Sequence, residues 1–212
     1  VEYKDVNFSY NESKQVLKNI NLVIPKGKTV ALVGQSGSGK STFVDLLPRF
    51  YDVNSGKICI DGIDIRELSF YNLREFMGNV NQDPILFNDT IYNNISMGKP
   101  DATEEEVYEA AKKARCYDFI MALPDGFQTV IGEGGATLSG GEKQRISIAR
   151  CILKDAPIVI LDEATASVDT DNESYIQEAI NELVKGKTLL VIAHRLNTCL
   201  LYTSDAADDL TR

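Results

Sequence analysis

The 212-residue chain contains no tryptophan, a single histidine and no apolar run close to the ~18–20 residues that a membrane-spanning helix requires. No signal-peptide pattern opens it, so we expect any membrane role to depend on segments outside this sequence. Basic residues are also scarce, because 22 Lys and Arg face 31 Asp and Glu, for a formal net charge of −9. Without a basic cluster, the composition argues against a nucleic-acid partner.

The four cysteines form no C-x-x-C pair and stand at Cys59, Cys116, Cys151 and Cys199. Each lies in an apolar or helical stretch, which predicts reduced thiols in the core of a cytosolic protein. We therefore expect neither a disulfide framework nor a cysteine metal site. A length of 212 residues suits one domain with room for an inserted subdomain.

A glycine-rich stretch follows the apolar run Val30–Val33 and matches G-x-x-x-x-G-K-[ST] over Gly34–Thr42. Glycines let consecutive backbone N–H groups point inward, and a helix starting near Lys40 adds the positive end of its dipole. Lys40 would reach the β- and γ-phosphates of a nucleotide, and the Ser41 hydroxyl would hold Mg²⁺. The alternative is a flexible turn, but a strand before the stretch and a helical pattern after it favour a phosphate-binding loop.

The first part of the chain has a β pattern. Val6–Tyr10 and Ile20–Ile24 alternate, a turn follows at 25–28, and 55–62 predicts a hairpin edge strand. Tyr10 is either a half-buried residue at a strand end or a platform for adenine, a contact that would contribute about 1–3 kcal/mol.

A brief helix is predicted over Ser69–Glu75, followed by a strand over Val80–Pro84. Gln82 would stand at the end of this strand, where ligands collect in open α/β sheets. It is either a ligand contact or a solvated cap.

Residues 88 to about 155 predict a helical insertion, with an N-cap at Thr103 and a capping box formed by Ser139 and Glu142. Gly140 and Gly141 in the first turn of the second helix each cost roughly 1 kcal/mol of helix propensity against alanine. This cost indicates that the exposed backbone at the helix start has a function. Binding an anion at a second helix N-terminus would be such a function.

Two further apolar runs predict buried parallel strands, and both end in polar residues. Ile158–Leu161 is followed by Asp162 and Glu163, and 188–193 is followed by His194. Paired carboxylates at the end of a core strand suit phosphoryl chemistry, with Asp162 directed to Mg²⁺ and Glu163 to an attacking water. His194 is either structural or catalytic.

Taken in this order, the motifs resemble the nucleotide-binding domain of ABC transporters over residues 6–198. The Walker A, Q-loop, signature, Walker B and H-loop motifs fall at Gly34–Thr42, Gln82, Leu138–Glu142, Ile158–Asp162 and His194. The resemblance implies an α/β fold: a P-loop NTPase core with a parallel sheet, an N-terminal antiparallel β portion and an inserted helical subdomain. We expect one ABC ATPase domain, with its core at 1–87 and 156–198 and its helical subdomain at 88–155.

The resemblance also implies ATP and Mg²⁺ as cofactors, and head-to-tail pairing with a second such domain, in a homodimer or a heterodimer. The residues expected to contact the nucleotide are Tyr10, Gly34, Ser36, Gly37, Ser38, Gly39, Lys40, Ser41 and Thr42, joined from the second domain by Ser139, Gly140 and Gly141. Ser41, Gln82 and Asp162 would hold the metal. The catalytic group would be Lys40, Gln82, Glu163 as general base and His194 as sensor of the γ-phosphate.

Leu86–Ile95 and Thr129–Gly135 resemble the exporter branch, in which lipid and multidrug exporters carry membrane helices ahead of this domain. This implies ATP-driven export at the cytoplasmic face of a membrane, through a transmembrane domain that this chain lacks. The chain departs from the exporter pattern at Ala166–Asp169, where exporters usually read Ser-Ala-Leu-Asp, and at Val130, where many have Glu. Residues 199–212 match nothing in the family, and we interpret them as translated adapter read-through on a truncated gene fragment.

Three alternatives stay open: the ATPase subunit of an importer, a non-transport ABC ATPase, and a nucleotide switch without hydrolysis. The short spacing between Lys40 and Ser139 leaves no room for a long coiled-coil insert, and the acidic charge argues against work on nucleic acid. The presence of Glu163 argues against the switch.

Overall fold

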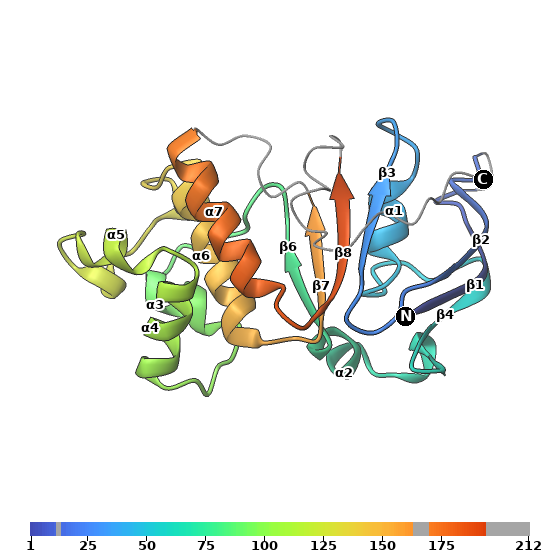
Figure 1. Cartoon of the computed structure of the whole chain (residues 1–212), viewed down its shortest axis with the longest axis horizontal. Coiled ribbons are helices and arrows are strands. Elements are labelled where there is room, and N and C mark those ends of the chain that lie inside the picture. The colour runs from blue at the N-terminus through green and yellow to red at the C-terminus, as the bar shows by residue number, and fades with distance from the viewer. Residues whose placement is uncertain (12–13, 163–169, 194–212) are drawn as a thin grey trace. The chain divides into compact units, whose positions relative to one another are not determined.

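The computed structural model describes residues 1–11, 14–162 and 170–193 (Figure 1). The chain divides into two compact units, 1–77 with 187–212 and 78–186. An antiparallel sheet at the N-terminus, a parallel strand pair and a helical segment confirm the predicted α/β class. Glu163, Ala166–Asp169, His194 and the tail 199–212 lie outside the described residues.

The antiparallel sheet of the first unit has the strand order β2-β1-β4-β5. Its strands are β1 (Glu2–Phe8), β2 (Leu17–Val23), β4 (Ser55–Ile60) and β5 (Ile63–Asp64). Tyr3, Val6 and Phe8 of β1 are buried, and the register pairs Tyr3 with Leu22 on one side and Ile58 on the other. The predicted strand over Val6–Tyr10 is therefore displaced toward the N-terminus, because the ladder with β2 and β4 already starts at Glu2.

Strands β3 (Thr29–Val33) and β8 (Thr188–Ala193) form a parallel pair whose register runs from Thr29↔Leu189 to Val33↔Ala193. Both were predicted from their apolar runs, and Leu189–Ile192 is buried as such a run requires. The pair is fixed at its start, where Gly27 N donates to Thr188 Oγ1 at 2.9 Å.

The short helix α1 (Lys40–Asp45) follows β3 and contacts β8. Its Phe43 ring stacks on the buried Tyr3 ring of β1, with centroids 4.0 Å apart and an interplanar angle of 19°. The Tyr3 hydroxyl also donates to the Phe43 carbonyl at 3.1 Å. This double contact joins the helix after the phosphate loop to the antiparallel sheet. The helical run ends before Pro48, as the proline predicts.

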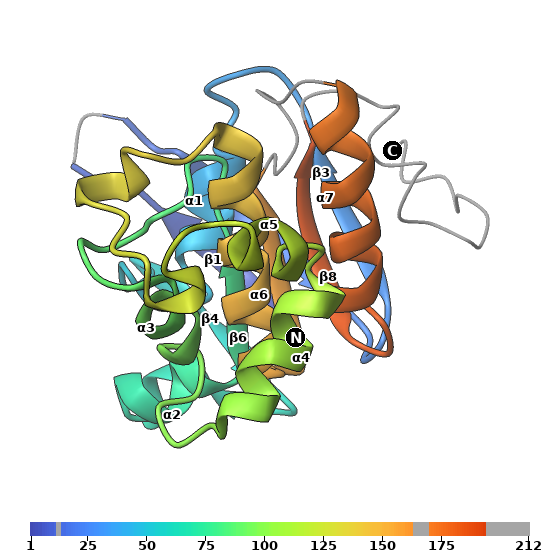
Figure 2. The same cartoon turned by 90° about the vertical axis from the view of Figure 1, so that its left-hand side faces the viewer.

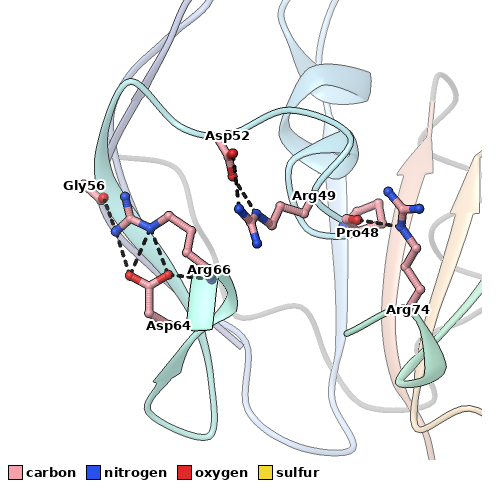
Figure 3. A network of polar contacts seen from close by, with 7 residues as sticks. All are labelled: Pro48, Arg49, Asp52, Gly56, Asp64, Arg66 and Arg74. Atoms are coloured by element: carbon pink, nitrogen blue, oxygen red, sulfur yellow. Dashed lines mark hydrogen bonds and ion pairs between the residues drawn. The ribbon is translucent and has the colours of Figure 1, made fainter. Parts of the chain in front are cut away.

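Arg66, on the 3-10 turn η1 (Ile65–Glu67), holds the end of the β4–β5 hairpin (Figure 3). Its guanidinium donates to both carboxylate oxygens of Asp64, Nε to Oδ1 at 3.0 Å and Nη2 to Oδ2 at 2.6 Å, and to the Gly56 carbonyl. The Asp64 side chain is only 13% exposed. Arg66 therefore lowers the pKa of Asp64, chiefly through this hydrogen bond.

Two more arginines hold the segment between α1 and β4 (Figure 3). Arg49 Nε donates to Asp52 Oδ1 at 2.6 Å, and Arg74 Nε donates to the Pro48 carbonyl at 3.1 Å. Arg74 lies on α2 (Phe70–Glu75), close to the helix predicted over Ser69–Glu75. Both guanidinium groups lie over the ring of Phe70, at 4.7 and 5.2 Å from its centroid.

The second unit is mainly helical (Figure 2). In chain order its elements are β6 (Met77–Val80), α3 (Ile91–Ser96), α4 (Glu104–Lys113), α5 (Tyr117–Met121), the 3-10 turns η2 (Gly126–Gln128) and η3 (Glu133–Gly135), α6 (Gly140–Lys154), β7 (Ile158–Asp162) and α7 (Thr170–Leu183). Helix α6 contacts α3, α4 and α7. The helical character of 88–155 is as predicted, whereas α7 was not anticipated.

The predicted strand over Val80–Pro84 is wrong in its bounds, because β6 covers Met77–Val80 and Gln82 lies beyond it. The physical reason is the partner of Asn81, whose carbonyl accepts a hydrogen bond from the Gln144 side chain of α6 at 3.2 Å. The chain thus leaves the strand before it reaches Gln82.

Both predicted helix starts of this unit are confirmed. The Thr103 and Ser139 hydroxyls accept from the amides of Glu106 and Glu142, and these glutamates accept from the amides of Thr103 and Ser139. Such reciprocal capping boxes satisfy amides that the first helical turn leaves without a partner.

Cys59, Cys116 and Cys151 are buried, as predicted for core residues, and Cys199 lies outside the described residues. Burial raises the pKa of the Cys116 thiol to about 12. Within the described ranges, none of the helices combines the length and apolar character needed to cross a membrane.

The contact between Tyr3 and Phe43 predicts a stability effect. Tyr3→Phe keeps the ring stack but leaves a buried carbonyl without its donor, and should lower the free energy of unfolding by about 1–3 kcal/mol. Tyr3→Ala should cost about 3–5 kcal/mol. Urea titration measures both. Tyr71→Phe, at a side chain 75% exposed, is the control and should be neutral; a Tyr3→Phe variant of unchanged stability would contradict the role of the hydroxyl.

The Asp64–Arg66 pair predicts acid sensitivity. Because the folded state lowers the pKa of Asp64, the pair contributes its full stability above the ordinary carboxyl pKa of about 4 and loses it as the pH falls through the lowered value. Asp64→Asn should flatten the dependence of unfolding on pH below about 4. Asp52→Asn removes a more exposed pair, with Asp52 56% exposed, and should flatten it less. Equal slopes for wild type and Asp64→Asn would refute the assignment.

Candidate functional site

The loop between β3 and α1 has the open backbone that its sequence predicts. Gly37 and Gly39 adopt left-handed conformations, with φ of 79° and 91°, which disfavour any other residue. A Cβ on Gly39 would also lie 3.1 Å from Leu17 Cδ2 and 3.2 Å from Val16 Cγ1. Residues 34–38 are exposed, and within them the Ser38 amide donates to the Gln35 carbonyl at 3.2 Å.

Lys40, the first residue of α1, turns back over this loop. Its Nζ donates to the Gly34 carbonyl at 2.8 Å and to the Gln35 carbonyl at 3.0 Å. The neighbouring Ser41 is exposed, whereas Thr42 is buried. A cation, an exposed glycine-rich loop and a hydroxyl are thereby gathered at one corner, an arrangement that could hold a polyphosphate and its metal.

Tyr10 lies beside the loop. Its hydroxyl is 2.9 Å from Thr42 Oγ1, and its ring remains 52% exposed. The rings of Phe8 and Tyr51 meet it edge-on, with centroids at 4.9 and 5.0 Å. The hydroxyl contact and the two rings fix the orientation of Tyr10, and a flat ligand could lie on its exposed face. Tyr51 was not identified from the sequence, because only the fold brings it to Tyr10.

Ser139 is the N-cap of α6, and its hydroxyl is engaged by the amide of Glu142 at 3.3 Å. Gly140 is exposed, and a Cβ built on it would meet nothing within 4 Å. Internal packing therefore gives no reason for glycine at this position. Gly141, the next residue, is buried.

Gln82 and Asp162 belong to the second unit: Gln82 lies two residues beyond β6, and Asp162 is the last residue of the neighbouring strand β7. Figure 1 shows both arrows pointing the same way, so both residues stand at the same end of the strand pair. Gln82 is exposed and Asp162 is partly exposed. These two residues thus share one end of neighbouring strands, whereas Tyr10 is joined to Thr42 of α1 by its hydroxyl.

The oxygen donors of Ser41, Gln82 and Asp162 are a hydroxyl, an amide and a carboxylate. In the part of the chain that the structure describes, no three His, Cys, Asp or Glu side chains gather as a metal cluster. A hydroxyl, an amide oxygen and a carboxylate are each oxygen donors of the kind that Mg²⁺ accepts, usually beside several waters and substrate phosphates.

Comparison with known proteins identifies relatives. A family model described as ABC transporter matches residues 17–166. The ATP-dependent lipid A-core flippase of Syntrophus aciditrophicus is 57% identical over 198 residues, which are 93% of this chain and 33% of the flippase. A Bacillus subtilis protein provisionally named multidrug export ATP-binding/permease protein YgaD is 54% identical over 199 residues, 93% of this chain and 34% of that protein.

Among solved structures, that of a bacterial Atm1-family ABC exporter with ATP bound superimposes with a TM-score of 0.87 at 45% identity. It covers 93% of this chain and 34% of the exporter. The chain thus spans about a third of the length of these relatives. With the family model matched from Leu17 through the Walker B strand, the chain belongs to the ABC transporter family.

Proposed function

We propose that this chain is the ATP-binding and ATP-hydrolysing motor domain of an ABC exporter, which powers export of a lipid, drug or other hydrophobic substrate. The observation that carries the proposal is the corner between β3 and α1, where Lys40 lies over an exposed glycine-rich loop and the Tyr10 hydroxyl contacts Thr42. The similarity of this chain to a flippase and to an export protein supports a role in export.

In this proposal the adenine lies on Tyr10 and the phosphates occupy the loop. The exposed ring offers the stacking surface, and Lys40 exchanges its carbonyl contacts for the β- and γ-phosphates when the nucleotide enters. The residues assigned to the nucleotide are Tyr10, Gly34, Ser36, Gly37, Ser38, Gly39, Lys40, Ser41 and Thr42.

Ser41, Gln82 and Asp162 are assigned to Mg²⁺, which when bound neutralises charge on the β- and γ-phosphates. Glu163 directly follows Asp162 and acts as general base toward the attacking water. His194 follows β8 and contacts the γ-phosphate. Glu163 and His194 are assigned by motif, since both lie outside the described residues.

A second copy of the domain completes the site. Gly140 is exposed at the N-terminus of α6, and a Cβ built on it would meet nothing within 4 Å among the residues that the structure describes, so its bare backbone suits approach by an external group. A γ-phosphate bound to the loop of a partner domain has the charge that this helix end attracts. Ser139, Gly140 and Gly141 would therefore act on the nucleotide of the other subunit.

The membrane part of the transporter is proposed as the further partner, with this domain at the cytoplasmic face and residues 1–198 as the ATPase. The names of the relatives, a flippase and an export permease, favour an exporter over an importer subunit. The net charge of −9 continues to argue against a role on nucleic acid.

Replacing the proposed general base separates binding from chemistry. Glu163→Gln keeps the size of the side chain but cannot accept a proton, so ATP turnover should fall about 10²–10⁴-fold. The Kd for ATP, measured by calorimetry, should stay close to that of the wild type. Glu173→Gln, at an exposed position on α7, is the control. Near-normal hydrolysis by the Glu163 variant would remove this role.

Complementation tests the shared site. Lys40→Ala should abolish phosphate binding in one chain, and Ser139→Arg should block the helix end that acts on the partner. Each variant alone should be inactive, but an equal mixture should regain up to roughly a quarter of wild-type ATPase activity, because half of the dimers carry one intact composite site. A mixture as inactive as its components, while the wild type turns over ATP, would argue against head-to-tail pairing.

A further inference from the structure

Helix α6 holds the chain on both sides of Gln82. Before Gln82, the Gln144 side chain, itself 2% exposed, donates to the Asn81 carbonyl at 3.2 Å. After Gln82, Arg150 Nη1 donates to the Ile85 carbonyl at 2.9 Å. Two side chains of one helix thus bracket a five-residue segment whose own side chains at 82 and 83 are exposed.

Arg150 belongs to a larger hydrogen-bond network centred on Asn94 of α3. The Asn94 side chain is fully buried. The Asn94 side-chain amide pairs with the backbone of Phe87, accepting from its N–H at 2.9 Å and donating to its carbonyl at 3.0 Å. Arg150 donates to Asn94 twice, from Nε to its backbone carbonyl at 2.7 Å and from Nη2 to Oδ1 at 3.2 Å. The planar guanidinium therefore joins Ile85 and Asn94 in a way that a lysine cannot reproduce.

Close backbone packing of α6 against the neighbouring α3 and β6 also holds these elements together. A Cβ on Gly98, just beyond α3, would lie 2.2 Å from the Arg150 carbonyl, so α3 and α6 approach too closely there for any side chain. Cys151 Sγ also lies 3.2 Å from the Asn79 carbonyl of β6. Burial lowers the pKa of the Arg150 guanidinium, a cost that its three carbonyl and amide acceptors offset.

We infer that Gln144 and Arg150 are positioning residues that make the Gln82 segment and the Ser139 end of α6 move as one body. The inference rests on the proposed function for the roles of Gln82 and Ser139. A displacement of the segment at 81–87 would therefore move α6, and with it the helix end that faces the partner's nucleotide. A displacement of that helix end would likewise move the segment at 81–87.

A purely structural role makes a different prediction from a positioning role. If these contacts only stabilise the fold, weakening them lowers the unfolding temperature and leaves turnover by the folded fraction unchanged. If they position Gln82 and Ser139, kcat falls while ATP affinity is kept, because Tyr10 and the phosphate loop are built from other elements.

The test uses conservative variants in the full chain. Gln144→Glu places a carboxylate against the Asn81 carbonyl, and Gln144→Met keeps the shape without the donor. Arg150→Lys keeps the charge but loses the fork. The controls are Gln177→Glu and Arg115→Lys, whose side chains bond on the surface to Asn181 and Glu178. Each variant is measured for kcat and KM with MgATP, and for amide hydrogen exchange without nucleotide.

In the Arg150 variant we expect faster exchange at the Phe87 amide and its neighbours, with α4 unchanged as an internal reference. In all three test variants we expect kcat to fall about 10- to 100-fold, the range for misplaced catalytic groups, and KM to stay within about threefold. The two controls should match the wild type in both measurements.

Unchanged exchange around Phe87, or unchanged kcat in all three test variants, would overturn the inference while leaving the proposed function intact if the wild type hydrolyses ATP. A parallel loss of kcat and ATP affinity would also overturn it, because that pattern indicates general damage. A wild-type chain that binds no ATP at all would instead overturn the proposed function, and this role of α6 with it.

Discussion

The phosphate loop depends on one constraint: β3 and α1 must meet at a fixed corner while the loop between them stays exposed. Pairing with β8 fixes β3, and the stack of Phe43 on Tyr3 fixes α1 from the opposite side. Gly39 then fits closely against Leu17 at the bend. Because the flanking elements supply the rigidity, the loop can stay open, and Lys40 can lie over its carbonyls.

Features whose causes are local in the chain could be predicted from the sequence. Strands β3, β7 and β8 each contain a continuous apolar run, and the runs Ile158–Leu161 and Leu189–Ile192 are buried, as in strands of a parallel sheet. The capping boxes at Thr103 and Ser139 need only two side chains three residues apart. The phosphate loop is equally local, because its glycine conformations and its lysine lie within nine residues.

Features that depend on distant partners could not be predicted in this way. The end of β6 is set by a hydrogen bond from Gln144, 63 residues beyond Asn81. The Tyr10 ring packs against Tyr51, a contact that forms only when β1 and the segment after α1 fold together. Arg150 and Asn94 carried no sequence signal either, since an arginine and an asparagine on helices read as ordinary surface residues until their burial is known.

The geometry of α6 explains why such costly contacts would be retained. Arg150 lies eleven positions after Ser139, which corresponds to roughly 16 Å of helix at 1.5 Å per residue. A loop of that length would absorb a displacement in its torsion angles, whereas a helix packed on α3, α4 and α7 transmits it. Apolar side chains could hold the seam as strongly, but they have no directional preference for the carbonyls of Asn81 and Ile85. Hydrogen bonds from Gln144 and Arg150 hold the Gln82 segment at one fixed position along the helix. Gln82 and Ser139 can move together only if this position does not change.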